Sequence, residues 1–314
     1  MKVFVTGGTG FIGRSLVRKL VEAGHEVRLL VRPSKKSPHV PTGVPVEIAV
    51  SSVSDGRGLR SAMAGMEAVV HLAGVERRGA YANLMNVDVQ GTRLVAQIGR
   101  ELGIERMMYV SHLGADRYSA YPISKVKGLG EDAIRESGVD YTIFRSAIVF
   151  GEGDSFTTGI ASLLATIPFF FLIPGNGRSL VQPIWVEDLT TVMTWALDDP
   201  QMANQIYEVG GPEMLSFTDV VQMIMDVTRQ KRRLLYIGAP YLRGLTVFLE
   251  TSFPRLPVSV FWLDYLAVNH TCALDTLPRV FSLLPSRLSQ RMDYLRKKNW
   301  REAFWKSMWG RSVT

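Results

Sequence analysis

Cysteine is nearly absent from this sequence of 314 residues, which contains one, Cys272. A lone cysteine forms no disulfide within the chain, and none of its sequence neighbours predicts a lowered thiol pKa. The five histidines show no metal-ligand spacing, so we expect no metal site. His71, which follows a predicted strand, is interpreted as a packing residue rather than as a base.

The sequence also lacks an apolar run long enough to cross a bilayer. The longest run, residues 160–173, is shorter than the roughly 20 residues of a span, and Pro168 and Pro174 interrupt or bound it. The first residues lead from a short apolar strand into glycines, without the apolar core of a signal peptide. We expect a cytoplasmic protein, with the inner face of a membrane as the alternative location.

An excess of charge is missing from most of the chain. The net charge is +7, but residues 286–314 hold eight cationic residues against two acidic ones and so supply +6 of it. Because the rest of the chain is nearly neutral and contains no recognised nucleic-acid module, we expect no nucleic-acid partner.

What the sequence does contain is an alternation of strand and helix patterns. Short apolar runs predict strands at residues 2–6, 26–31, 44–50, 68–72, 106–111 and 141–145. Helical spacing between them predicts helices at residues 12–21, 81–102 and 121–137. This order is typical of an α/β fold with a Rossmann-type, doubly wound parallel sheet, which we assign to residues 1–150.

The alternation weakens after Gly151. Helices at residues 186–197 and 216–228 and a strand at residues 206–209 are expected to form a smaller substrate lobe, assigned to residues 151–285 and interleaved with the main domain. Residues 286–314 are predicted to form a separate basic, amphipathic C-terminal segment.

A glycine-rich turn joins the first predicted strand to the first predicted helix. Gly7 permits a sharp turn, Gly10 lets the backbone approach a pyrophosphate, and Gly13 lets the helix pack closely on the sheet. The amides at the start of the helix then face the anion, with Thr9, Phe11 and Ile12 beside it. The turn therefore predicts a dinucleotide site.

The end of the second strand predicts which dinucleotide binds. It reads Leu29-Leu30-Val31-Arg32, without the acidic residue that would accept hydrogen bonds from a ribose hydroxyl. Arg32, helped by Lys35 or Arg14, would pair with a 2′-phosphate, which favours NADPH over NADH. The alternative is that Arg32 is a solvated loop charge.

Tyr121 and Lys125 are four residues apart at the start of a predicted helix and so share a face. A neighbouring ammonium lowers the pKa of a phenol, which could then exchange a proton with a carbonyl oxygen as hydride is transferred. Ser111, at the carboxyl end of the preceding strand, is placed to polarise that carbonyl. The alternative is a packed tyrosine beside a surface lysine.

These motifs occur in an order that resembles the short-chain dehydrogenase/reductase superfamily over roughly residues 1–230. The motifs are the turn of residues 6–13 and the segments 70–74, 86–92, 121–125 and 145–151. The resemblance implies that Ala73 and Gly74 lie against adenosine and that Asn86 shapes the long helix. It also implies that Lys125 holds the nicotinamide ribose and that residues 146–148, with Ile148, line the nicotinamide pocket.

Within the superfamily, the chain is most similar to atypical members related to the nucleotide-binding accessory subunit of respiratory complex I. Residues 181–188 and 207–212 also resemble extended, epimerase-like members. Two positions depart from the pattern: Ser52 stands where many members place an adenine-contacting aspartate, and Ser111 lies closer to Tyr121 than in extended members.

The resemblance leaves two functions open. The first is an NADPH-dependent oxidoreductase acting on a carbonyl or hydroxyl of a lipophilic small molecule, since residues 160–173 and 234–266 are apolar enough to roof a pocket. The alternative is a non-catalytic, nucleotide-stabilised scaffold or assembly subunit of a membrane complex.

The C-terminal segment combines cations with aromatic residues. On a helix over residues 296–309, Trp305 and Trp309 would lie on one side, with Trp300 near it. Such a helix can lie in the interface of an anionic membrane, which predicts peripheral membrane contact. The alternative is that its tryptophans pack onto the domain while its cations stay solvated.

Overall fold

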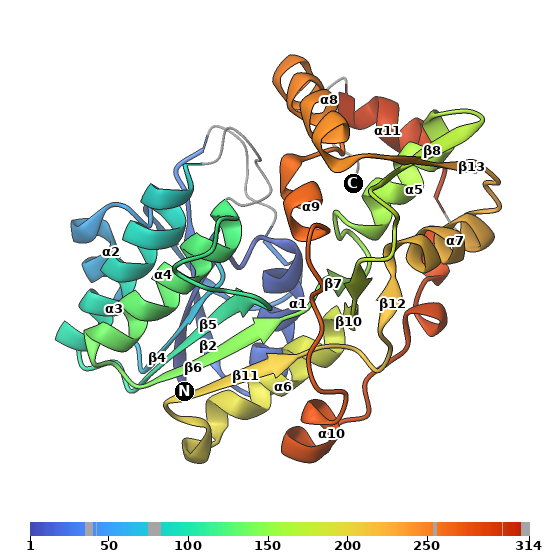
Figure 1. Cartoon of the computed structure of the whole chain (residues 1–314). Coiled ribbons are helices and arrows are strands. Elements are labelled where there is room, and N and C mark those ends of the chain that lie inside the picture. Colours follow the sequence, from blue (N-terminus) through green and yellow to red (C-terminus); the bar gives the residue numbers. More distant parts are fainter. Residues whose placement is uncertain (35–39, 42, 75–82, 254–255, 297, 309–314) are drawn as a thin grey trace.

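The structure is a computed structural model that describes residues 1–34, 40–41, 43–74, 83–253, 256–296 and 298–308. Figure 1 shows two parts side by side, a central sheet between helices and a second group of helices and short strands. The first part is the larger and contains the N-terminus.

Seven parallel strands form the central sheet in the order β11-β6-β5-β4-β1-β2-β3. Their bounds are β1 Lys2–Thr6, β2 Glu26–Val31, β3 Glu47–Val50, β4 Ala68–His71, β5 Arg106–His112, β6 Tyr141–Ser146 and β11 Gln205–Val209. The strand order reverses at β1, as expected for a doubly wound Rossmann-type sheet, and this confirms the predicted fold class.

Alternating side chains of the central strands enter two separate cores. Val3 and Val5 of β1 pack with α1 (Phe11–Glu22) and α6 (Val186–Asp198), whereas Phe4 packs with the helices of the opposite face. Those helices are α2 (Gly56–Met63), α3 (Thr92–Glu101) and α4 (Pro122–Ser137). Because both faces are covered, β4 is buried at all four positions, which explains its apolar run Ala68-Val69-Val70 before His71.

Strand β11 and helix α6, which were predicted for the smaller lobe, belong to the main domain. Strand β11 pairs in parallel with β6, and α6 packs on α1, where the Ser15 hydroxyl lies 2.8 Å from Glu187 Oε1 and 2.9 Å from Thr190 Oγ1. The expectation for residues 186–197 and 206–209 was therefore wrong, because the chain leaves the sheet after β6 and returns to it. The predicted domain boundaries themselves stay predictions.

The long helix predicted for residues 81–102 is composite. A π-helical turn over Met85–Gly91 precedes α3, and Tyr81 lies outside the described residues. The strand predicted from Val44 begins at Glu47. The other predicted elements of the main domain lie within about two residues of their predicted bounds, whereas α2 was not predicted.

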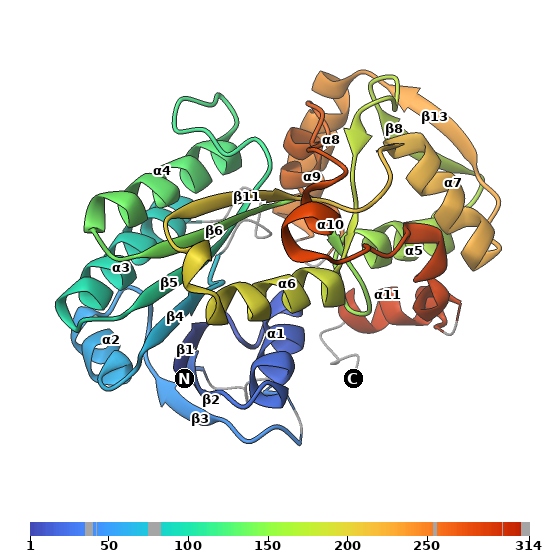
Figure 2. The same ribbon diagram turned by 90° about the horizontal axis from the view of Figure 1, so that it is seen from below.

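The second group of elements has its own core around Phe156, Leu164 and Phe217. Its helices are α5 (Thr157–Thr166), α7 (Phe217–Thr228), α8 (Ala239–Ser252), α9 (Val260–Tyr265) and α11 (Trp300–Met308). Its strands pair two by two, β8 (Phe170–Pro174) with β13 (Arg233–Ile237), β9 (Leu180–Val181) with β12 (Leu215–Ser216), and β7 (Val149–Phe150) with β10 (Ile184–Trp185). Helix α10 (Thr276–Phe281) instead packs Leu277 and Phe281 into the core of the main domain. Figure 2 shows α10 beside β11, the element that carries the chain back along the sheet.

The apolar run at residues 160–173 is divided between α5 and β8. Among the described residues, no helix has the length and apolar character needed to cross a bilayer.

The C-terminal segment is partly folded onto the second lobe. Trp300 and Phe304 of α11 are buried, and the Trp300 indole N–H donates to the carbonyl of Leu295 at 2.7 Å. The expectation that Trp300 lies near the exposed side of Trp305 was therefore wrong. Trp305 remains about half exposed, and Trp309 lies outside the described residues.

Candidate functional site

The glycine turn connects β1 to α1 in the predicted way. Gly7 has a φ of 72°, a left-handed conformation that favours glycine, and its carbonyl accepts a hydrogen bond from Gly10 N at 2.9 Å. Helix α1 starts at Phe11 and no side chain caps that end. Its first N–H groups are therefore available to an anion.

Gly13 and Gly10 differ in the space that a Cβ atom would have. A Cβ at Gly13 would lie 2.3 Å from the Gly7 carbonyl oxygen, so close packing of α1 on the turn requires glycine there. A Cβ at Gly10 would meet only that oxygen, at 3.1 Å, and Gly10 is exposed. The open side of Gly10, flanked by the half-buried Thr9, Phe11 and Ile12, fits the approach of a pyrophosphate.

The residues expected near adenosine lie at the ends of the next strands. Arg32 follows β2 and is exposed, while Arg14 donates from Nη1 to the Thr9 carbonyl at 3.2 Å. Ala73 and Gly74 follow β4, and Ala73 N donates to Thr6 Oγ1 at 3.3 Å. Lys35, the suggested helper of Arg32, lies outside the described residues.

His71 is fully buried behind this edge of the sheet. Its Nδ1 lies 2.7 Å from Thr6 Oγ1 and its Nε2 lies 3.0 Å from Thr92 Oγ1. Burial, reinforced by the nearby Lys127 ammonium, lowers the pKa of His71 to about 3. A neutral imidazole with a hydrogen-bond partner at each ring nitrogen confirms the packing interpretation. Burial likewise raises the pKa of the Cys272 thiol to about 11, as expected for an unreactive cysteine.

A cavity of about 80 Å³ lies at the carboxyl ends of β5 and β6. It is lined by Ile12 of the glycine turn, Ser111 of β5 and the predicted residues 146–148. The Ser111 side chain is only 2% exposed, and its hydroxyl has no hydrogen-bond partner among the described residues. An unsatisfied buried hydroxyl is costly, so this position fits contact with a ligand.

Helix α4 presents a different lysine to this cavity from the predicted one. Lys127 lines the cavity and is buried, with Nζ 3.7 Å from Asp88 Oδ1. Lys125 is exposed, and Tyr121, the N-cap of α4, is half-buried; neither is among the lining residues. The structure thus brings together Ser111 and Ile148 but does not place Tyr121 and Lys125 with them.

The helical period could have identified Lys127. Ile123, Lys127 and Ile134 recur at helical spacing and are all buried, so Lys127 lies on the inner face of α4. A buried lysine on an apolar stripe is a stronger signal than the Tyr-x-x-x-Lys spacing, because lysine is rarely buried without a partner.

The second lobe contributes residues to the cavity that sequence analysis missed. Phe261, Trp262 and Tyr265 of α9 all line it. Burial raises the pKa of the Tyr265 phenol well above its ordinary value, and its ring centroid lies 3.8 Å from that of His270. Burial also lowers the pKa of His270 to about 4. The cavity is therefore lined by a phenol, and an imidazole outside the lining packs against that phenol.

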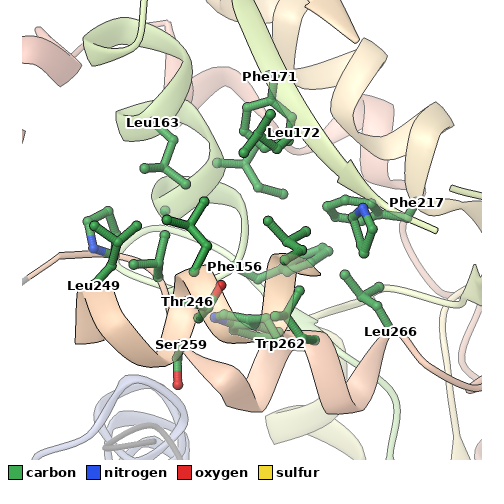
Figure 3. Close-up of a pocket in the computed structure, with 18 of the residues that line it drawn as sticks. Phe156, Leu163, Phe171, Leu172, Phe217, Thr246, Leu249, Ser259, Trp262 and Leu266 are labelled. Carbon is green, nitrogen blue, oxygen red and sulfur yellow. The ribbon is translucent and has the colours of Figure 1, made fainter. Parts of the chain in front are cut away.

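A second cavity, of about 160 Å³, adjoins the first at Trp262, which lines both. Figure 3 shows aliphatic and aromatic side chains converging on it, among them Phe156 and Leu163 from the α5 side and Leu249 of α8. The few polar groups in its lining include the hydroxyls of Thr246 and Ser259. Such a lining suits a hydrocarbon group.

Sequence comparison agrees with this architecture. A family model described as NAD(P)H-binding matches residues 7–162. Sterol demethylase protein B of Methylococcus capsulatus is 31% identical over 284 residues, covering 81% of this chain and 84% of that protein. The chain belongs to the extended short-chain dehydrogenase/reductase type of NAD(P)-binding proteins.

Relatives in this family have diverse names. The ceramide reductase of Caulobacter vibrioides is 29% identical, covering 83% of this chain and 81% of that protein. NADH dehydrogenase (ubiquinone) 1 alpha subcomplex subunit 9, mitochondrial, of Arabidopsis thaliana is 28% identical, covering 87% of this chain and 70% of that protein. The family thus includes named enzymes and a named subunit of a dehydrogenase complex.

Solved structures share the fold over almost the whole chain. An NADPH-dependent quinone oxidoreductase from Escherichia coli, complexed with NADPH, is 15% identical with a TM-score of 0.72, covering 93% of this chain and 99% of that chain. The Bordetella bronchiseptica enzyme WbmH, in complex with NAD⁺, is 15% identical with the same TM-score of 0.72, covering 93% and 96%. The shared fold accommodates both dinucleotides, so it does not decide between them.

Proposed function

We propose that this protein is an NADPH-dependent oxidoreductase that acts on a carbonyl or hydroxyl of a lipophilic small molecule. The observation that supports this most is that Trp262 lines both cavities. One cavity offers, beside the glycine turn, the Ser111 hydroxyl, which no described residue hydrogen-bonds, and the other offers an apolar lining. A reacting carbonyl in the first and a hydrocarbon group in the second would fit one ligand.

Bound NADPH would supply hydride to the carbonyl carbon. The chain must then polarise the carbonyl oxygen and give it a proton, so that the product is an alcohol. We assign polarisation to Ser111 and retain Tyr121 as a proton donor with Lys125 as its cationic neighbour. Tyr265 is the competing donor, because its phenol lines the cavity. Lys127 supplies the buried positive charge on this side.

The preference for NADPH over NADH rests on Arg32. A 2′-phosphate at the end of β2 would meet an exposed guanidinium and no carboxylate in the segment Val31-Arg32-Pro33-Ser34. The remaining cofactor contacts are assigned to Gly7, Thr9, Gly10, Phe11, Ile12, Gly13, Ala73, Gly74, Lys125 and Ile148.

The lipophilic substrate is supported by two independent observations. The cavity of about 160 Å³ is lined almost entirely by aliphatic and aromatic side chains. Two relatives are named for lipid substrates, a ceramide and a sterol.

A non-catalytic scaffold of a membrane complex is the second candidate. The exposed Lys125 and the position of Tyr121 outside the cavity favour it, because a scaffold needs the glycine turn but no working phenol. The Arabidopsis relative is named as a subunit of a dehydrogenase. In this case the protein would act at the inner face of a membrane, with Trp305 and the cations of α11 as one contact.

Reduction of 2-alkanones of increasing chain length by NADPH distinguishes the two functions. Each added methylene buried in the apolar cavity should raise kcat/KM about threefold to fourfold until the cavity is full. Leu163→Trp, which fills the cavity, should flatten this dependence, whereas Leu102→Trp, at an equally half-buried leucine of the other lobe, should not. NADPH binding without reduction of any alkanone would support the scaffold instead.

A further inference from the structure

Helix α8 (Ala239–Ser252) carries apolar residues on two adjacent faces. Its inner face carries Leu242, Thr246 and Leu249, which line the larger cavity. Its outer face carries Tyr241, Leu245 and Phe248, spaced at i, i+4 and i+7 and exposed by 82%, 43% and 63%. A helix on the surface of a soluble domain normally directs charged residues outward, so the outer stripe of α8 needs a partner of its own.

The segment that contains this helix has an excess of positive charge. Between Lys231 and Phe253 the sequence has four cations and a single acidic residue, Glu250, which is buried. Lys231 and Arg233 are exposed ahead of α8, while Arg243 forms an ion pair with Asp264. The stripe is thus accompanied by free positive charge and by no exposed carboxylate within the same segment.

Further elements with this character lie on the same lobe. Figure 1 places α8 and α11 at the upper end of the second lobe, with β13 on the same lobe, and Figure 2 shows α11 on the other side of this lobe from α8 and β13. Strand β13 exposes Leu235 and Tyr236, and α11 exposes Trp305 together with Arg301 and with Lys306, whose ammonium pairs with the exposed Glu302. Exposed aromatic side chains interspersed with cations are typical of surfaces that enter the headgroup region of a bilayer.

We propose that the outer face of α8 docks on an anionic lipid bilayer and that an apolar ligand passes from the bilayer, around α8, into the larger cavity. The helix is the wall between the cavity and the exposed stripe, and Leu245 belongs to both. The docking step does not depend on the proposed reduction, since it would serve a lipid-binding scaffold equally well.

A second copy of the chain fits this stripe less well than a bilayer does. Its three side chains expose on the order of 350 Å² in total, judged from the area that such residues bury. A stable protein interface requires roughly 800 Å² on each partner. The excess of positive charge beside the stripe would also oppose pairing with an identical surface.

Vesicle flotation tests docking, with full-length protein and vesicles of phosphatidylcholine that contain about 30% phosphatidylglycerol. The test variant combines Tyr241→Asp with Phe248→Asp. The matched control combines Tyr118→Asp with Val50→Asp, because these residues are 83% and 66% exposed and lie on the other lobe. Both variants should retain the wild-type Tm, since none of the four side chains is buried.

We expect the wild type and the control to float with the vesicles and the test variant to partition at least about tenfold more weakly. Wild-type protein that does not float would overturn the proposal, as would equal partitioning of the two variants. Loss of flotation in Trp305→Asp alone, with the test variant unaffected, would assign docking to α11. A wild-type dimer in light scattering that Tyr241→Asp converts to monomer would assign the stripe to a second copy.

Discussion

Replacing Gly10 with alanine should separate cofactor binding from folding. The residue lies in extended backbone, with φ −77° and ψ 178°, a conformation that alanine adopts without strain. Its added methyl group would meet only the Gly7 carbonyl oxygen, at 3.1 Å, and would otherwise point to the open side of the turn. The free energy of unfolding should therefore fall by no more than about 1 kcal/mol, the usual range for a change at a helix N-cap.

The same methyl group would occupy the space that a pyrophosphate must enter. Steric overlap of this kind costs about 1–3 kcal/mol, which corresponds to NADPH binding that is roughly 5-fold to 150-fold weaker. Gly13→Ala is the contrasting variant, because its Cβ would lie 2.3 Å from the Gly7 oxygen and 2.6 Å from the Gly8 Cα. It should lose stability as well as affinity.

NADPH fluorescence titration and urea unfolding of the two variants measure these effects. Unchanged affinity in Gly10→Ala would refute the assignment of this turn as the pyrophosphate site. A loss of stability in Gly10→Ala as large as that in Gly13→Ala would refute the separation of the two roles.

Three further predictions concern single side chains. Arg32→Glu should reverse the preference for NADPH over NADH in binding titrations, whereas an unchanged preference would remove Arg32 from the cofactor site. Tyr265→Phe should lower kcat for ketone reduction more than Tyr121→Phe if the cavity-lining phenol is the donor, and the reverse order would restore the Tyr-x-x-x-Lys pair. His71 has a folded-state pKa of about 3, below the ordinary 6.5, so its contribution to stability is complete above pH 6.5 and is lost as the pH falls towards 3. Urea unfolding between pH 7 and 4 should therefore show a slope up to about 1.4 kcal/mol per pH unit steeper for the wild type than for His71→Asn, and parallel slopes would contradict this.

The main domain could be predicted from sequence because each of its elements is specified locally. The turn at Gly7, the apolar strands and Arg32 are each recognisable from a short stretch of neighbouring residues. The position of β11 could not be predicted in this way, since a strand far along the chain pairs with β6 through contacts that no local pattern encodes.

The candidate site was predictable only in part, for the same reason. Ser111 lies in β5 and Ile148 closely follows β6, and both line the expected cavity. Lys127 was missed because a motif spacing was preferred to the helical period of α4. Tyr265 was missed because α9 comes from the second lobe, where packing against distant helices rather than local propensity determines the fold.

Transfer of deuterium from NADPH to a lipophilic ketone is the most direct measurement of the proposed function. The wild-type protein should convert 2-tridecanone, in the presence of NADPH deuterated at the nicotinamide C4 position, into an alcohol that mass spectrometry shows to carry one deuterium at the carbinol carbon. The short control ketone 2-butanone should react far more slowly, because it cannot fill the cavity beyond Trp262. Tight NADPH binding with no deuterated alcohol from any long-chain or polycyclic ketone would contradict the proposal and leave the scaffold as the function.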